Sequence, residues 1–318
     1  MVFKIVKKIM HNLLKNSIAS FGSLIPFQLL KVGKIYPPFL PFYHIVSNSK
    51  PEYIDSYIIR SSFEFENELD YLLKHFKPVD LKTIVNSPQK NLMHLTFDDG
   101  LKECHSVIAP ILKRKGIPAT FFINPNFVDN EDIFHRFKRT VLNSRGFLQP
   151  KGEKYFINES NLLDEVAVKN GISFTDYLAI NQPYLKIEEI QSLKSDGFTI
   201  GSHSLNHPEF WTLNEDEQYA QIEKSMKWIV DHFQPEIRTF SFPFTDDQVK
   251  RSLFNKLKEN DVLDVNFGTA GLKFDQVSFN LQRIPMERKQ NWNARKVVHF
   301  EYFYYFVRSL LGNNFVIH

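Results

Sequence analysis

Apolar runs of strand length alternate with helix-length segments along most of this 318-residue chain. The expected strands lie at 39–46, 92–97, 119–123, 198–202 and 239–242, with shorter ones near 262–267 and 281–284. The expected helices lie at 63–76, 107–112, 187–195, 215–233, 248–259 and 294–311. Repeated strand-then-helix order favours parallel strands, because each parallel connection needs a long crossover. The sequence therefore predicts an α/β protein, either a (β/α) barrel or a doubly wound sheet.

Two segments depart from this alternation. Between about residues 125 and 186 the chain is polar with scattered aromatic residues, which we interpret as an insertion after the second core strand. Residues 1–36 form a basic arm ahead of the Pro37-Pro38 break, and the first acidic residue of the chain is Glu52. We expect a single barrel over 37–318. The arm is interpreted either as a helix on an anionic membrane surface or as a helix packed on the body.

Composition excludes several classes of protein. A net charge of +3 does not predict a nucleic-acid footprint, and no glycine-rich phosphate loop occurs. The single cysteine, Cys104, rules out an internal disulfide or a cysteine-based zinc cluster and is expected to be a packing residue. No apolar stretch is long enough to cross a bilayer, and no convincing cleavable signal is present. The expected location is cytoplasmic or peripheral to the inner face of the membrane.

The first chemical motif is Thr96-Phe97-Asp98-Asp99-Gly100, at the end of an apolar run. Two adjacent carboxylates at a buried strand end repel each other, so a cation or a shared proton is needed to relieve them. The alternative is an ordinary Asp-Asp-Gly surface turn. The motif alone does not decide between a metal site and a turn.

The second motif is His203-Ser204-Leu205-Asn206-His207-Pro208, which also follows an expected strand. Two imidazoles and one carboxylate form a ligand set that suits Zn²⁺, Fe²⁺ or Co²⁺ and leaves positions open. Parallel strands gather their carboxyl ends on one face of the fold. The two motifs are therefore expected to meet in one site.

These motifs resemble those of the polysaccharide deacetylases with NodB homology, carbohydrate esterase family 4. Thr96–Gly100 matches the family's T-F-D-D-G, and His203–Pro208 matches its H-[ST]-x-x-H-P. The resemblance implies a distorted (β/α) barrel that removes acetyl groups from N-acetylated sugars. It also implies that Asp98 is the general base and that a divalent metal is held by three ligands, Asp99, His203 and His207. Zn²⁺ is the expected ion, with Fe, Co, Ni or Mn as alternatives.

Two further family motifs are matched only in part. In the R-x-P-[YF] motif this chain keeps Pro243 and Phe244, but Ser241 stands where the family's base-holding Arg is expected. By resemblance, the Phe244 backbone N–H is an oxyanion donor and Pro243 is assigned to substrate contact. The family's Leu-x-x-His, which supplies the general acid, has no clear match.

Leu281-Gln282-Arg283 occupies about the place of that last motif but offers an arginine, which is too basic to shuttle protons near neutral pH. Arg283 is therefore assigned to substrate contact. His44, at a strand end, is the best remaining candidate for the acid. His299, in the last expected helix, is assigned a packing or surface role rather than a catalytic one.

The insertion contributes a basic group near two phenylalanines, namely His135, Arg136, Lys138 and Arg139 beside Phe134 and Phe137. These residues are interpreted either as a contact for an anionic or diphosphate-linked glycan or as a solvated helix face. For the whole chain, the main hypothesis is an active N-deacetylase acting on a polymeric or lipid-linked sugar. The alternatives are a glycan-binding pseudoenzyme and a metal-dependent hydrolase of another C–N or ester bond.

Overall fold

The computed structural model describes residues 22, 25–31, 35–54, 59–86, 91–148, 159–288, 292–310, 312 and 314–318. Within them, eight parallel strands form the main sheet in the order β10-β8-β7-β6-β5-β4-β1-β11. The strands are β1 (Pro41–Tyr43), β4 (Leu95–Phe97), β5 (Ala119–Ile123), β6 (Thr199–Ser202), β7 (Thr239–Ser241), β8 (Val265–Gly268), β10 (Asn280–Gln282) and β11 (Ile284–Pro285).

The two ends of this sheet meet, because β10 and β11 belong to one segment with only Arg283 between them. β10 pairs with β8, and β11 pairs with β1 on the other side of the gap. The Arg283 N–H donates to the Gly268 carbonyl at 3.1 Å, and the Ile284 N–H donates to Leu40 at 2.8 Å. The sheet is thus a distorted (β/α) barrel, which confirms the predicted fold class.

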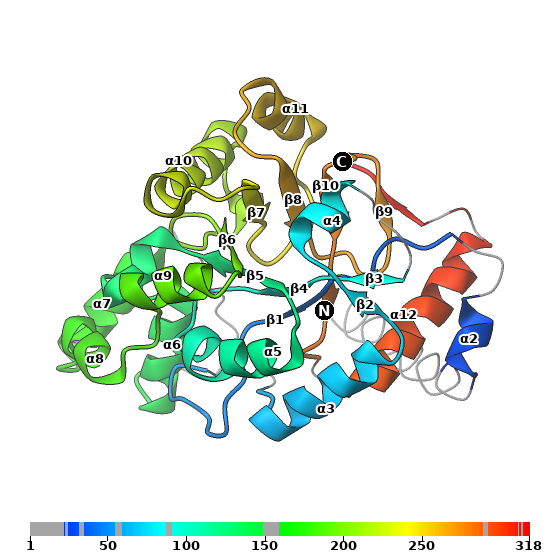
Figure 1. Cartoon of the computed structure of the whole chain (residues 1–318). Coiled ribbons are helices and arrows are strands. Elements are labelled where there is room, and N and C mark those ends of the chain that lie inside the picture. The colour runs from blue at the N-terminus through cyan, green and yellow to red at the C-terminus, as the bar shows by residue number, and fades with distance from the viewer. Residues whose placement is uncertain are drawn as a thin grey trace, which may run out of the picture.

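Helices surround the barrel (Figure 1). They are α2 (Phe27–Leu30), α3 (Ser62–Leu73), α4 (Leu81–Asn86), α5 (Ala109–Lys115), α6 (His135–Ser144), α7 (Ser160–Lys169), α8 (Phe174–Asn181), α9 (Ile187–Ser195), α10 (Glu215–Phe233), α11 (Arg251–Glu259) and α12 (Ala294–Ser309), with short helical turns η1 (Cys104–Ile108), η2 (Pro125–Asn130) and η4 (Phe210–Thr212). Capping boxes at Ser61 and Asn214 start α3 and α10, since each side chain satisfies a backbone donor of the first turn. Cys104 is buried in the main core, as expected of a packing residue.

Two small parallel sheets lie beside the barrel, β2 (Lys77–Pro78) with β3 (Leu92–Met93) and β9 (Phe274–Asp275) with β12 (Phe315–Val316). The first sheet corrects the prediction of one strand at 92–97, because the strand divides at His94. The buried His94 imidazole is 2.8 Å from both the Val79 carbonyl and Thr120 Oγ1. The apolar run could not reveal this break, since residues on both sides of it are buried.

The segment 125–186 contains helices α6, α7 and α8 between its described residues. Its aromatic residues form a second buried cluster that includes Phe134, Phe137 and Tyr184. The segment without strand–helix alternation is therefore helical in its described part. Its aromatic residues give it a buried apolar cluster of its own.

Most of the basic arm lies outside the described residues. Its described end, α2, packs against α12, where the Phe27 and Tyr302 rings are 4.8 Å apart. His299 is buried in the same contact, with Nδ1 3.1 Å from the Gly22 carbonyl, so it packs as expected. No helix in the described ranges is both long and apolar enough to cross a membrane.

Candidate active site and metal centre

Strands β4, β6 and β7 bring the two sequence motifs and Ser241 to one end of the barrel, with β5 between β4 and β6. Asp98 and Asp99 follow β4, His203 follows β6, and Ser241 is the last residue of β7. All three strands are parallel, so their carboxyl ends open on the same face. Gly201 in β6 allows the Phe122 ring to pack closely against its backbone, because a Cβ at Gly201 would lie 2.6 Å from that ring.

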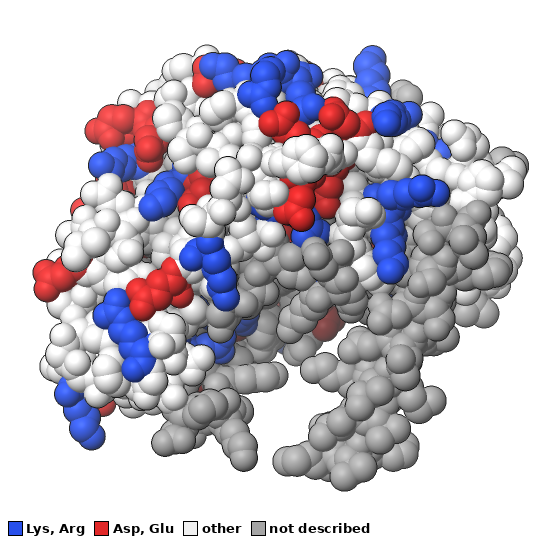
Figure 2. Space-filling model, turned by 90° about the horizontal axis from the view of Figure 1, so that it is seen from below, with Lys and Arg blue, Asp and Glu red and all other residues white. Residues whose placement is uncertain are grey.

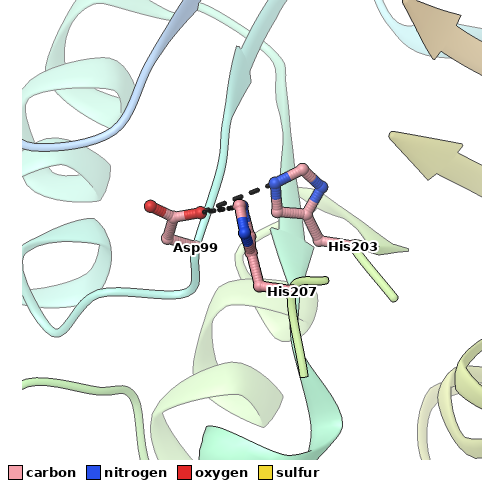
Figure 3. A group of neighbouring side chains, drawn as sticks. All are labelled: Asp99, His203 and His207. Atoms are coloured by element: carbon pink, nitrogen blue, oxygen red, sulfur yellow. Dashed lines mark ion pairs between the residues drawn. The ribbon is translucent and has the colours of Figure 1, made fainter. Parts of the chain in front are cut away.

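Asp99, His203 and His207 point toward one another (Figure 3). Asp99 Oδ1 lies 3.5 Å from His203 Nε2 and 3.2 Å from His207 Nε2. The His203 Nδ1–H donates to the Ser241 carbonyl at 2.8 Å, which leaves Nε2 as the ring nitrogen that faces Asp99. The three side chains are at most 3% exposed. One carboxylate and two imidazoles in this arrangement fit a divalent metal ion.

The protonation states also suit metal binding. Burial lowers the pKa of His207 to about 4, so its imidazole is neutral near pH 7. Burial alone would raise the pKa of Asp99, but His207 and His203 hold it well below its ordinary value. Neutral imidazole and charged carboxylate are the forms that coordinate metals.

Left-handed backbone conformations concentrate at this site. Asp99, Ser204, His207 and Phe244 have φ values of 71°, 68°, 57° and 59°. Such conformations are costly for residues with a Cβ and persist where surrounding contacts impose them. Asn124 provides one such contact, since its Nδ2 donates to the carbonyls of His203 and Ser204. Two metal-ligand candidates, Asp99 and His207, are thus held in place by backbone turns.

Arg283 holds Asp98 in a bidentate ion pair. Arg283 Nη1 is 2.7 Å from Asp98 Oδ1, and Nη2 is 2.8 Å from Asp98 Oδ2. The same guanidinium donates to Thr96 Oγ1 at 2.8 Å and to Ser241 Oγ. Burial raises the pKa of Asp98, but Arg283 and His203 outweigh it and hold the pKa below its ordinary value. Ser241, at the expected arginine position, instead accepts a hydrogen bond from Arg283, which lies between β10 and β11.

This placement conflicts with the expectation that Arg283 contacts substrate. Its side chain is 0% exposed, and its hydrogen bonds go to Asp98, Thr96, Ser241 and Gly268. Pro243 is also buried, directly before Phe244.

His44 is paired with Glu287 at the next strand end. His44 Nδ1 lies 2.5 Å from Glu287 Oε2, and the backbone N–H groups of His44 and Ile45 both donate to Glu287 Oε1 at 3.0 Å. Burial lowers the pKa of His44, but Glu287, Asp99 and Asp98 together raise it to about 9. The imidazole is therefore protonated near pH 7, and its side chain is 20% exposed.

The segment after β5 supplies one wall of the site. The Phe134 ring lies 4.5 Å from His207, and Phe244 lies 4.5 Å from His207 on another side. The Arg136 guanidinium stacks 3.7 Å above the Phe244 ring and pairs with buried Glu209 at 3.3 Å. Of the basic group predicted in this segment, Arg136 reaches the site.

The other members of that group are placed differently. His135 Nε2 is 3.1 Å from Glu209 and both are fully buried, while Lys138 pairs with Asp164 at 2.8 Å. Glu209 and Glu287 were not predicted as site residues. Glu209 follows Pro208 of the second motif by one position, but a single acidic residue beside a motif carries no signal about its partner.

The strand ends of this parallel barrel thus gather a candidate Asp-His-His metal centre and a neighbouring carboxylate. A family model described as "Polysaccharide deacetylase" matches residues 85–262, more than half of the chain. The chain belongs to the polysaccharide deacetylase family, as its two motifs predicted. A search of curated protein sequences found no match.

Solved structures of deacetylases share this fold. The deacetylase PplD of Streptococcus pyogenes, solved with acetate, superposes with a TM-score of 0.57 and 13% identity, covering 84% of this chain and 99% of its own. IcaB of Ammonifex degensii gives a TM-score of 0.54 and 18% identity over 83% and 97% of the two chains. A de-N-acetylase of Aggregatibacter actinomycetemcomitans gives 0.53 and 14% identity over 82% and 99%. At these identities the likeness establishes the fold.

Proposed function

We propose that this protein is a metal-dependent carbohydrate N-deacetylase. The observation that carries this proposal is the convergence of Asp99, His203 and His207 beside a separate carboxylate, Asp98, held by Arg283. The family membership and the resemblance of the motifs support the same reaction. Zn²⁺ is the ion that this ligand set suits best, with Fe, Co, Ni or Mn as alternatives.

The three ligands hold the ion, and the remaining residues handle protons. A divalent ion held there supplies polarisation of the acetyl carbonyl and acidification of water. Asp98 removes the proton from the attacking water, since it stays a carboxylate beside Arg283 and its orientation is fixed by the bidentate pair. The water oxygen then bonds to the carbonyl carbon.

His44 completes the reaction as the general acid. Its imidazolium, sustained by Glu287, donates a proton to the amine nitrogen as the C–N bond breaks, which releases acetate and the free amino sugar. The Phe244 N–H, on a strained turn next to His207, stabilises negative charge on the former carbonyl oxygen. Arg283 acts through Asp98 as a positioning residue, in place of the substrate contact expected from the sequence.

The sugar is proposed to bind across the aromatic surface at this end of the barrel. Trp211 is 36% exposed and lies 5.7 Å from the half-buried Phe244 ring, and the Arg136 guanidinium lies 3.7 Å from the same ring. Pro243, directly before Phe244, is buried, so any contribution to substrate contact passes through its neighbour. An N-acetylated sugar, polymeric or lipid-linked, is the proposed substrate.

Acetate release tests this function directly. Metal-reconstituted protein is incubated with a panel of N-acetylated glycans, and acetate is quantified before and after removal of metal by chelation. We expect release that stops on chelation and returns when Zn²⁺ is restored. Stoichiometric metal without acetate release from any glycan would instead identify a glycan-binding pseudoenzyme, and release from O-acetyl substrates alone would identify an esterase.

Membrane contact through the basic arm stays a separate proposal. On the face shown in Figure 2, the described Lys and Arg side chains are interspersed with Asp and Glu. The proposal therefore depends on residues 1–36 and their six lysines. Full-length protein is expected to bind anionic liposomes at low salt and to be released when the arm is deleted. No liposome binding by the full-length protein would contradict it.

A further inference from the structure

A second group of potential metal ligands lies outside the site described above. Asp246 comes from the loop between β7 and α11, Asp275 is the last residue of β9, and His318 follows β12. Their side chains are at most 3% exposed. One ligand atom from each lies within 4.8 Å of the others. Two buried carboxylates this close need a counter-charge.

The amide of Asn280 is a fourth group at the same point. Its Nδ2 position is 2.9 Å from Asp246 Oδ2, 2.9 Å from Asp275 Oδ2 and 3.3 Å from His318 Nε2. His318 Nε2 is 3.0 Å from Asp275 Oδ2 and 3.7 Å from Asp246 Oδ2. Four ligand atoms bound at about 2.0–2.1 Å from a tetrahedral ion lie roughly 3.3–3.4 Å from one another. The observed separations lie around that value.

Buried amide atoms without partners point to a missing ligand here. Asn280 Oδ1 has no hydrogen-bond partner among the described residues, although Asn280 is only 1% exposed. An Asn amide is oriented by its hydrogen bonds, so an ion at this point would turn the Asn280 amide, bringing Oδ1 among the other three ligand atoms and leaving Nδ2 on the far side. Asn266 is the register partner of Asn280 on β8 and faces the same side of the sheet. It is fully buried, and neither of its amide atoms has a partner in the described structure.

The surroundings hold the two carboxylates in place. Gln282 Nε2 donates to Asp246 Oδ2 at 2.5 Å and to Asp275 Oδ2 at 2.7 Å. Gln282 Oε1 accepts from the Ala270 N–H at 2.7 Å, which fixes the amide orientation. A Cβ on Gly268 would lie 2.0 Å from Asp246 Oδ2, so glycine is required for this approach. Hydrogen bonds of this kind commonly orient metal-ligating carboxylates.

We propose that Asp246, Asp275, His318 and Asn280 bind a second divalent cation in a closed structural site. Nitrogen and oxygen donors in this number suit Zn²⁺. The site is connected to the active site, because Asp246 Oδ1 accepts from the Thr269 N–H at 3.3 Å and Thr269 Oγ1 donates to the Phe244 carbonyl at 3.0 Å. The second ion thus anchors the loop that carries Phe244.

The competing counter-charge is a proton on His318. Burial lowers the pKa of His318, but Asp275 and Asp246 outweigh it and raise the pKa. An imidazolium would neutralise one carboxylate and would leave the number of bound ions per chain at one. The two occupants are therefore distinguished by counting ions.

Metal content after reconstitution with Zn²⁺ and exhaustive dialysis is the test. We expect two ions per chain in the unaltered protein, one in Asp99→Asn, one in Asp275→Asn and none in the double variant. Asp247→Asn, an exposed neighbour in the same loop, is the matched control and should retain two. Zn²⁺ should also raise the Tm of Asp99→Asn but not of the double variant. This last readout does not depend on activity.

Asn280→Ala covers the case in which Asp275→Asn does not fold, because it leaves every charge in place. In the Asp99→Asn background it should weaken Zn²⁺ retention. One ion in the unaltered protein together with none in Asp99→Asn would overturn the proposal and assign the counter-charge to His318. That result would leave the primary site intact, so the two conclusions fail separately.

Discussion

Asp98 and Asp99 are adjacent residues at the end of one strand, yet they belong to two chemically different regions. Asp98 faces a guanidinium from the segment that closes the barrel, whereas Asp99 faces two imidazoles that follow β6. The left-handed conformation of Asp99 turns the chain between them. Two like charges can therefore share a buried strand end when each has its own partner, here a guanidinium for one and a pair of imidazoles for the other.

The largest expected effect follows from changes in the imidazole region, by which we mean Asp99, His203 and His207. The guanidinium region is Asp98 with Arg283. His203→Ala or His207→Ala removes one of three protein ligands of the primary site, so metal content should fall by one ion per chain and acetate release should be lost. Metal content and acetate release are measured on the same samples, with His232→Ala on the exposed face of α10 as the matched histidine control. Full metal retention by both site variants would show that these imidazoles are not ligands.

The next effect falls on Asp98 itself. Asp98→Asn preserves shape but removes the base, so the rate should drop by at least about 10²-fold, the lower end of what a general base contributes. Acetate release at saturating glycan is the measurement. If the variant kept most of its rate, the base would be another group. The proposed distinction between the two carboxylates would then be wrong.

A variant of Arg283 tests the same comparison through the partner of Asp98. Arg283→Lys keeps the charge but cannot reproduce the bidentate pair together with the bonds to Thr96 and Ser241, so kcat should fall by up to about 100-fold. Because Arg283 lowers the pKa of Asp98, weakening the pair should also move the acid limb of the kcat/KM profile to higher pH.

Metal content separates this role from a general loss of structure. It should be unchanged in Arg283→Lys, because the imidazole region does not contact the guanidinium through any described hydrogen bond. An unshifted acid limb with reduced kcat would mean that Arg283 supports the fold without positioning the base.

The smallest effect at neutral pH concerns His44. Its pKa of about 9 keeps it protonated near pH 7, so an acid role predicts activity that declines as pH rises through about 9. Glu287→Gln removes the charge that raises this pKa, and the alkaline limb should move to lower pH, toward the ordinary histidine value of about 6.5. The acid limb, set by Asp98, should stay in place. An alkaline limb that does not move would exclude His44 as the titrating acid.

The sequence predicted that Asp99, His203 and His207 would lie together, but it did not predict the pairing of Arg283 with Asp98. The three candidate ligands lie in two short motifs at strand ends, and parallel strands bring such ends together regardless of loop details. Arg283, by contrast, reaches Asp98 from 185 residues further along the chain, and Glu287 reaches His44 across 243. Both contacts depend on how residues 280–287 close the barrel, which no local pattern encodes.

Ser241 illustrates the limit of motif comparison. Its place in the R-x-P-[YF] motif indicated that an arginine was missing, but a guanidinium reaches the same point from Arg283, between β10 and β11. The hydrogen bond from Arg283 to Ser241 Oγ shows that the smaller side chain leaves room for that substitution. A guanidinium therefore reaches Asp98 although the motif position itself carries a serine.

The paired comparison of Asp98→Asn and Asp99→Asn tests the division between these regions most directly. Zn²⁺ affinity at the primary site and acetate release are measured on the same preparations. The account predicts that Asp98→Asn binds the primary ion almost normally and loses deacetylation, while Asp99→Asn loses affinity for that ion itself. Equal loss of the ion in both variants, with activity of Asp98→Asn restored by excess metal, would contradict it.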